Sequence, residues 1–237
     1  MLACILFFVP VRFEKRFHQQ SIQYSSDRVL TWFECFDEGT ERGRCMRREF
    51  LDKIEASPVI AAVKDDSELE RCLRSEVDVV CILYGDVCTI PAIVQRIKDA
   101  GRTAMVHLDL VAGLSPKEVS VDYIRLQTKA DGVITTRANL IRHARESGLA
   151  TILRYFVLDS LALINIEKQS QQHHASQPDL IEILPGVISP KVLSRICQMS
   201  RVPVIAGGLI HDREDVMNAL NAGAIAISTS TPDVWEM

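Results

Sequence analysis

Two short segments near the C-terminus, VIAGGLI at residues 204–210 and AISTS at residues 226–230, decide how this sequence folds. Each begins as an apolar run of the kind that forms a buried strand, and each ends in small or hydroxylated residues. Gly207 and Gly208 allow backbone N–H groups to approach an anion because they carry no Cβ atom. The second segment ends in three hydroxyl groups, those of Ser228, Thr229 and Ser230.

Six more apolar segments, rich in Val and Ile, lie upstream of these two at fairly regular intervals. The eight predicted strands are Val59–Val63, Val79–Leu83, Ala104–Leu108, Gly132–Ile134, Thr151–Phe156, Leu180–Leu184, Val202–Ala206 and Ala224–Ile227. Segments as apolar as these are buried on both faces, as parallel strands covered by helices are.

Amphipathic stretches of helical length separate the apolar segments. They are Ser67–Ser75, Ile90–Ala100, Ser115–Lys129, Arg137–Ser147, Ser160–Gln172, Ser189–Met199 and Arg213–Ala222. Eight strands alternating with helices predict an α/β fold, a small (βα)8 TIM-type barrel with short connections. An open doubly wound sheet is the alternative architecture.

The end of the chain matches the phosphate site that such barrels commonly carry. In (βα)8 barrels a phosphate group sits between the loops after strands 7 and 8 and the N-terminus of a short extra helix. Here Thr231-Pro232 begins a final helix, Pro232–Met237, directly after AISTS. The predicted phosphate ligands are Gly207, Gly208, Ser228, Thr229 and Ser230. Paired glycines alone would indicate no more than a tight turn, so the order of the features carries the prediction.

The first 45 residues differ in composition from the rest. They hold six of the eight Phe and show neither helical nor strand periodicity. We interpret residues 1–45 as an extension read through from upstream of the natural start at Met46, and a loosely ordered N-terminal arm is the alternative. From Arg48 to Ala56 a short helix is expected, followed by the barrel domain, residues 46–237.

Composition excludes little and suggests a cytoplasmic protein. The formal net charge of −4 gives no argument for a nucleic acid or a membrane as partner, so any RNA binding must come from a local basic patch. No segment is long enough to span a bilayer. The seven cysteines lie mostly in apolar runs, which indicates reduced, buried thiols. Neither metal-ligand spacing nor a cofactor motif is present, so no cofactor is expected.

Polar residues at the other strand ends converge on one mouth in a barrel. We expect Lys64, Asp109, Arg154 and Glu182 to contact a ligand there. Arg154 and Glu182 lie inside strand-like runs, where a charge is costly unless it is paired, and the two could neutralise each other. His107 and Asp109 alternate along one run and should point to the same side. The alternative for each residue is an ordinary solvated charge.

Several motifs, in this order, resemble the glycerol-3-phosphate-responsive antiterminators of bacteria. They are EASPVIAAVK (55–64), VHLDL (106–110), GVITT (132–136), EILPG (182–186), IAGGLI (205–210) and AISTS (226–230), with Trp235. The resemblance covers nearly all of residues 46–237 and none of the first 45. It implies a barrel that binds glycerol 3-phosphate, the phosphate on strands 7 and 8 and the glycerol hydroxyls facing Lys64, Asp109 and Glu182. Arg137 stands where lysine is expected in relatives.

The resemblance also implies a regulator without catalytic turnover that acts on the leader mRNA of a glycerol operon. Arg137, Arg142 and Arg145 around one predicted helix could form its RNA-binding patch, although a solvated helix face would look the same. The alternative is a phosphate-sugar enzyme, an isomerase, aldolase or prenyltransferase, because a barrel does not specify its function. Lys64 could then form an imine. A barrel that has lost both roles and a homo-oligomeric state are also left open.

Overall fold

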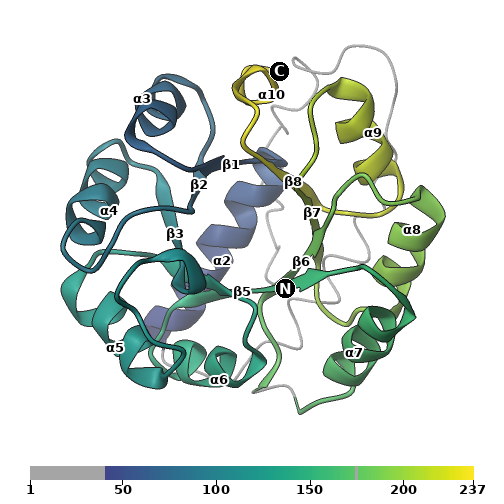
Figure 1. Ribbon diagram of the computed structural model, residues 1–237, viewed down its shortest axis with the longest axis horizontal. Coiled ribbons are helices and arrows are strands. Elements are labelled where there is room, and N and C mark those ends of the chain that lie inside the picture. The colour runs from purple at the N-terminus through teal and green to yellow at the C-terminus, as the bar shows by residue number, and fades with distance from the viewer. Residues whose placement is uncertain (1–40, 174–175) are drawn as a thin grey trace, which may run out of the picture.

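The computed structural model describes residues 41–173 and 176–237, which form a closed barrel of eight parallel strands (Figure 1). Each strand pairs with the next along the chain, and β8 pairs with β1. The strands are β1 Val59–Val63, β2 Val79–Ile82, β3 Thr103–His107, β4 Gly132–Thr135, β5 Ala150–Phe156, β6 Leu180–Leu184, β7 Val204–Gly207 and β8 Ala226–Thr229. The predicted barrel is confirmed, and the open doubly wound sheet is wrong.

Helices surround the barrel on its outside, one after each strand (Figure 1). They are α3 Asp66–Arg74, α4 Ile90–Asp99, α5 Glu118–Gln127, α6 Ala138–Glu146, α7 Ser160–Ser170, α8 Pro190–Met199, α9 Arg213–Asn221 and the short α10 Pro232–Trp235, with a 3-10 turn η2 Leu108–Leu110 after β3. Asp65, Asp159 and Asp212 accept hydrogen bonds from the first-turn amides of α3, α7 and α9. These aspartates at the strand ends therefore act as helix caps.

Strand β7 begins two residues later and ends one residue later than the sequence predicts, and β8 lies two residues later at both ends. Val202 and Pro203 precede β7, while Ser228 and Thr229 are the last two residues of β8. The shift matters because successive residues of a strand point to opposite sides. Ser228 and Thr229 consequently cannot both face the lumen of the barrel.

A helix closes the N-terminal end of the barrel. Helix α2, Glu41–Ala56, lies across the barrel at the end far from the viewer in Figure 1. Its Phe50 and Ile54 are fully buried among lumen side chains. The helix expected from Arg48 thus begins at Glu41 and crosses the proposed start at Met46. Residues 1–40 lie outside the described residues, and the interpretation of residues 1–45 as an extension stays a prediction.

Apolar side chains fill the lumen above α2. They are Ile60, Ala62, Val79, Cys81, Met105, Ile134, Ala150, Ile152, Leu180, Ile205 and Ala226. The core on the outer face of the strands packs against the surrounding helices. Because both faces of the strands are covered, a polar group at the C-terminal mouth stands out against an otherwise apolar barrel.

Candidate functional site

A polar layer lies directly above the apolar filling of the lumen. Two residues beyond the last apolar lumen residue of a strand, the same face carries a polar side chain or a glycine on seven of the eight strands. Five of these residues are buried within their strands: His107, Arg154, Glu182, Gly207 and Ser228. Lys64 and Thr136 directly follow β1 and β4 and are exposed, and Leu83 after β2 is the exception. The sequence therefore concentrates its lumen polarity at the C-terminal mouth, where barrel enzymes and sensors bind their ligands.

Arg154 and Glu182 form a buried ion pair in this layer. They are register partners on β5 and β6, and Arg154 Nε donates to Glu182 Oε2 over 2.6 Å. The residues are 8% and 2% exposed, so each compensates the desolvation of the other. The predicted neutralisation is confirmed. No hydrogen bond from the described residues reaches Glu182 Oε1, which is not among the fully buried atoms.

Glu182 also explains why position 207 is glycine. A Cβ atom at Gly207 would lie 2.5 Å from Glu182 Oε1, well inside van der Waals contact. The first glycine of the pair therefore makes room for a carboxylate. An anion at this part of the mouth would therefore contact the residues that follow Gly207.

His107 is a buried member of the layer that the sequence analysis did not select as a ligand residue. It is 2% exposed, and its Nδ1 has no hydrogen-bond partner. Asp109 Oδ2 lies 3.9 Å from this nitrogen, beyond hydrogen-bond distance. Burial and, to a lesser degree, the nearby Arg154 guanidinium lower the pKa of His107 to about 4. The imidazole is therefore neutral at pH 7.

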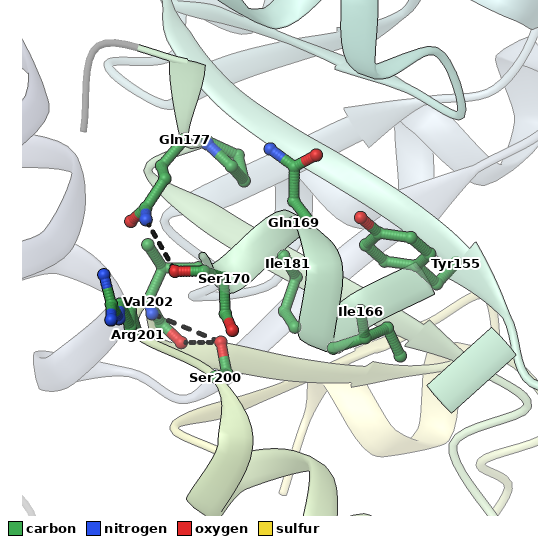
Figure 2. A pocket seen from close by; sticks show the side chains of 10 residues that line it. Tyr155, Ile166, Gln169, Ser170, Gln177, Ile181, Ser200, Arg201 and Val202 are labelled. Carbon is green, nitrogen blue, oxygen red and sulfur yellow. Dashed lines mark hydrogen bonds between the residues drawn. The ribbon is translucent and has the colours of Figure 1, made fainter. Parts of the chain in front are cut away.

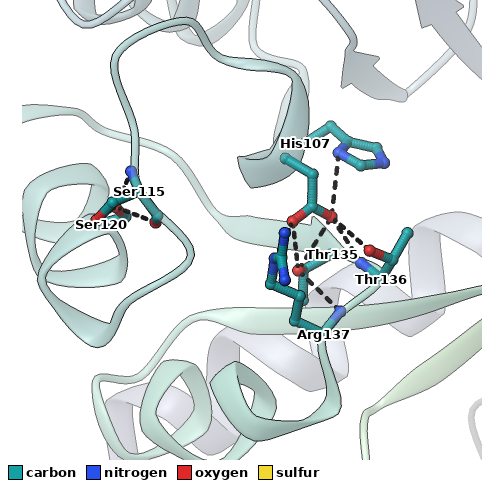
Figure 3. Close-up of polar contacts among 7 residues, drawn as sticks. His107, Ser115, Ser120, Thr135, Thr136 and Arg137 are labelled. Atoms are coloured by element: carbon teal, nitrogen blue, oxygen red, sulfur yellow. Dashed lines mark hydrogen bonds and ion pairs between the residues drawn. The ribbon is translucent and has the colours of Figure 1, made fainter.

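Asp109 organises the loop after β4, and its partners Thr135, Thr136 and Arg137 are labelled in Figure 3. Its carboxylate accepts hydrogen bonds from the hydroxyls of Thr135 and Thr136, from the Thr136 amide at 2.7 Å and from Arg137 Nε at 3.2 Å. The expectation that His107 and Asp109 alternate along one strand is wrong, because β3 ends at His107 and Asp109 belongs to the 3-10 turn η2. With both carboxylate oxygens engaged, Asp109 positions the start of α6.

The predicted phosphate loops after β7 and β8 lie side by side. Gly207 is the register partner of Ser228, and the Gly208 amide donates to the Ser228 carbonyl at 3.2 Å. Gly208 and Leu209 have φ values of 76° and 61°, so the chain turns sharply away from β7. Within residues 41–173 and 176–237, no acceptor takes the amide hydrogen of Leu209 or Ser230. Two free donors thus project from neighbouring loops.

The hydroxyls of β8 are not equivalent. The Thr229 hydroxyl donates to the Ile210 carbonyl at 2.7 Å and accepts from the Thr231 amide at 3.0 Å. Its carbonyl accepts from Trp235 Nε1, which anchors α10. Thr229 therefore fastens the β7 and β8 loops together, whereas Ser228 faces the lumen and has no hydrogen-bond partner for its hydroxyl among the described residues.

Lys64 lies at the rim of the mouth, after β1. Its side chain is 54% exposed, and Nζ is 3.4 Å from Glu68 Oε1. An imine-forming lysine is normally activated by desolvation or by a second cation. Lys64 has a carboxylate neighbour and open solvent, which is the setting of an electrostatic contact at the rim.

The three arginines of the predicted RNA-binding patch occupy different environments. Arg137 stands at the start of α6, beside Asp109, and Arg142 is 67% exposed in an ion pair with Glu146. Arg145 is only 6% exposed, and its Nη1 donates to the Gln177 carbonyl at 2.5 Å. The structure therefore does not bring Arg145 to a common surface with the other two. The helical periodicity of α6 turns this position toward the barrel.

A pocket on the outside of the barrel lies away from this site. It lies between α7 and the segment before β7 and is lined by Tyr155, Ile166, Gln169, Gln177, Ile181 and Val202, among others (Figure 2). It has room for about one water molecule. Across the described part of the chain, no cluster of three His, Cys, Asp or Glu side chains could hold a metal ion, and no helix is long and apolar enough to cross a membrane.

Comparison with known proteins points to one family. The family model described as "glycerol-3-phosphate responsive antiterminator" matches residues 59–235. An uncharacterised Escherichia coli (strain K12) protein, YgcP, is 46% identical over 187 residues, which are 79% of this chain and 96% of that protein.

Two solved structures are similar in both fold and sequence. The first is a glycerol uptake operon antiterminator regulatory protein from Listeria monocytogenes, 33% identical with a TM-score of 0.70 over 76% of this chain and 95% of that one. The second is a glycerol uptake operon antiterminator-related protein from Thermotoga maritima, 32% identical with a TM-score of 0.65 over 76% and 98%.

Proposed function

Because the chain belongs to the family of glycerol-3-phosphate responsive antiterminators, we propose that it senses glycerol 3-phosphate and regulates glycerol-utilisation operons through their leader mRNA. In this proposal the effector binds at the C-terminal mouth of the barrel. The liganded protein then acts on the transcript in the cytoplasm so that transcription continues past a terminator. It does so without turning over its ligand.

Glycerol 3-phosphate is supported as the effector because the mouth has hydrogen-bond donors on one side and a carboxylate on the other. The β7 and β8 loops offer donors, namely the amides of Leu209 and Ser230 and the Ser228 hydroxyl. The β6 sector offers a carboxylate, Glu182, held by Arg154. Donors suit a phosphate and a carboxylate suits hydroxyl groups, so this polarity fits a small polyol phosphate. The resemblance assigns Lys64 to the glycerol hydroxyls, but in this proposal it adds a positive charge on the phosphate side instead, because β1 is the neighbour of β8.

The mechanism in this proposal is linkage. Glycerol 3-phosphate binds the RNA-competent state more tightly than the incompetent one and thereby shifts the population toward it. In this mechanism Asp109 connects the ligand site with α6. It lies 3.9 Å from His107 in the lumen and also holds Arg137 at the start of that helix. Arg137 and Arg142 would supply phosphate-backbone contacts along this helix.

The test is a binding titration of the full chain with the leader RNA of a glycerol operon from the same genome. RNA affinity should rise several-fold when glycerol 3-phosphate is present, and it should fall steeply with salt. Glycerol and inorganic phosphate, each added alone, are the matched controls and should not reproduce the effect. An RNA affinity that is the same with and without glycerol 3-phosphate contradicts the proposal. Consumption of a triose or sugar phosphate would instead indicate an enzyme.

A further inference from the structure

One buried side chain at the mouth has a polar atom that the fold leaves unused. Four buried side-chain nitrogen or oxygen atoms in the described residues lack a hydrogen-bond partner: Arg47 Nη2, Arg102 Nε, His107 Nδ1 and Asp179 Oδ1. Of these residues only His107 lies in the polar layer. Arg102 and Asp179 directly precede β3 and β6, and Arg47 lies on α2, so all three are at the N-terminal end of the barrel.

An unpaired polar atom in a buried site is costly, so a fold keeps one where something else uses it. His107 is neutral at pH 7, because burial lowers its pKa to about 4. A neutral imidazole can accept a hydrogen bond at one ring nitrogen. Asp109, the nearest carboxylate, is committed to the loop after β4 and lies too far away to take a hydrogen from Nδ1. In the tautomer that carries its proton on Nε2, Nδ1 is the acceptor of the ring, and no group of the described residues uses it.

A second acceptor without a partner faces the same lumen. Glu182 uses Oε2 for Arg154, whereas Oε1 lies over the Cα of Gly207 and accepts no hydrogen bond from the described residues. His107 on β3 and Glu182 on β6 thus present two acceptors, while the β7 and β8 loops present donors. A ligand that fits has acceptor oxygens at one end and more than one hydroxyl at the other.

We propose that His107 accepts a hydrogen bond from a hydroxyl of the effector and, with Glu182, makes the site select phosphate esters that carry two hydroxyls over esters that carry one. The inference deepens the proposed function and rests on it. Glu182 accepts a hydrogen bond from one hydroxyl of the glycerol end, and His107 accepts one from the other. Thr136, which directly follows β4 at the rim, contributes no acceptor of comparable strength because its hydroxyl donates to Asp109.

The test is calorimetric titration of the full chain with three esters: glycerol 3-phosphate, 3-hydroxypropyl phosphate and 2-hydroxypropyl phosphate. The last two each lack one hydroxyl. His107→Phe removes the acceptor and keeps a ring, and His107→Asn keeps an acceptor near the position of Nδ1. We expect His107→Phe to weaken glycerol 3-phosphate binding about tenfold and His107→Asn to retain most of the affinity.

The esters that lack a hydroxyl separate a ligand contact from a structural effect. The ester that lacks the hydroxyl bound by His107 should bind the wild type about tenfold more weakly than glycerol 3-phosphate does. Its affinity should not fall further in His107→Phe. The inference is overturned if His107→Phe binds glycerol 3-phosphate as the wild type does, or if it loses all three esters and inorganic phosphate equally. A wild type that binds no glycerol 3-phosphate overturns the proposed function itself.

Discussion

Strands β5 and β6 carry a buried charged cluster near each of their ends, and the two clusters differ in what surrounds them. At the mouth, Arg154 pairs with Glu182, whose Oε1 lies beside Gly207 and accepts no hydrogen bond from the described residues. At the N-terminal end, Asp179 is 1% exposed; it accepts from the amide and hydroxyl of Thr151 and lies 3.7 Å and 3.8 Å from the Nε atoms of Arg47 and Arg145.

Burial of charge does not by itself mark a functional site. The N-terminal cluster joins β5 and β6 to α2 and α6, the helices that carry Arg47 and Arg145, and is enclosed by protein. The mouth cluster is equally buried but opens onto a layer of unused donors and acceptors. The first is expected to determine stability and the second to determine ligand affinity.

The largest effect expected is on stability, at the N-terminal cluster. Asp179→Asn keeps the shape of the side chain but removes the charge that faces two buried guanidinium groups. The free energy of unfolding should fall by about 3 kcal/mol. Urea unfolding of the wild type and the variant measures this. Glycerol 3-phosphate affinity of the folded variant should stay within twofold of the wild type, and a large loss of affinity would mean that this cluster also contributes to ligand binding.

His107 at the mouth should make the free energy of unfolding depend on pH. The pKa of His107 is about 4 in the folded protein and near 6.5 when unfolded, so the unfolded chain binds this proton first as the pH falls. The stabilising contribution is fully present above pH 6.5 and is lost progressively between pH 6.5 and 4. Between pH 7 and pH 4 the wild type should lose about 3 kcal/mol more of its unfolding free energy than His107→Asn does. Parallel losses in the two proteins would contradict this assignment.

The affinity counterpart of Asp179→Asn is Glu182→Gln. It removes the charge of the free acceptor while preserving its size next to Gly207. Glycerol 3-phosphate should bind about tenfold more weakly, since a hydrogen bond to a charged acceptor is replaced by one to a neutral acceptor. Isothermal titration of both variants, side by side, would show affinity loss in Glu182→Gln alone. Equal losses would mean that the two clusters are not functionally distinct.

The smallest effect is expected from replacing a glycine of the phosphate loop, compared with a glycine of similar backbone conformation elsewhere. Gly208 has a φ of 76°, and a Cβ there would meet only Leu184 at 3.5 Å, an ordinary contact. Gly101 has a φ of 73° and nothing within 4 Å of a Cβ. Gly208→Ala and Gly101→Ala should therefore cost similar stability, about 1 kcal/mol each. Only Gly208→Ala should weaken glycerol 3-phosphate binding, by a few-fold, because its loop carries the free Leu209 amide.

Much of this architecture follows from local sequence pattern. Eight apolar runs alternating with amphipathic ones suffice for the barrel, and the order of the glycine and hydroxyl segments places two neighbouring loops correctly. Arg154 and Glu182 were recognisable as partners because a charge in a buried strand needs one. The pattern could not fix strand ends to within two residues, and Thr229 therefore proves to be a structural link between the two loops. Neither could periodicity alone show that Arg145 is engaged by the Gln177 carbonyl.

His107 shows what sequence analysis lacks most. Its position one step above Met105 on the lumen face was readable from strand alternation. That its Nδ1 is left without a partner depends on Asp109 turning away into η2, which only the folded chain determines. Unused hydrogen-bonding capacity is a property of three-dimensional neighbours and not of spacing.

The most direct test of the central claim is a crystal structure of the protein with glycerol 3-phosphate bound. We expect phosphate oxygens within hydrogen-bond distance of the Leu209 and Ser230 amides, with the glycerol hydroxyls directed at Glu182 and His107. A phosphate bound away from the β7 and β8 loops, or a ligand lying with its hydroxyls toward Gly208, would contradict it.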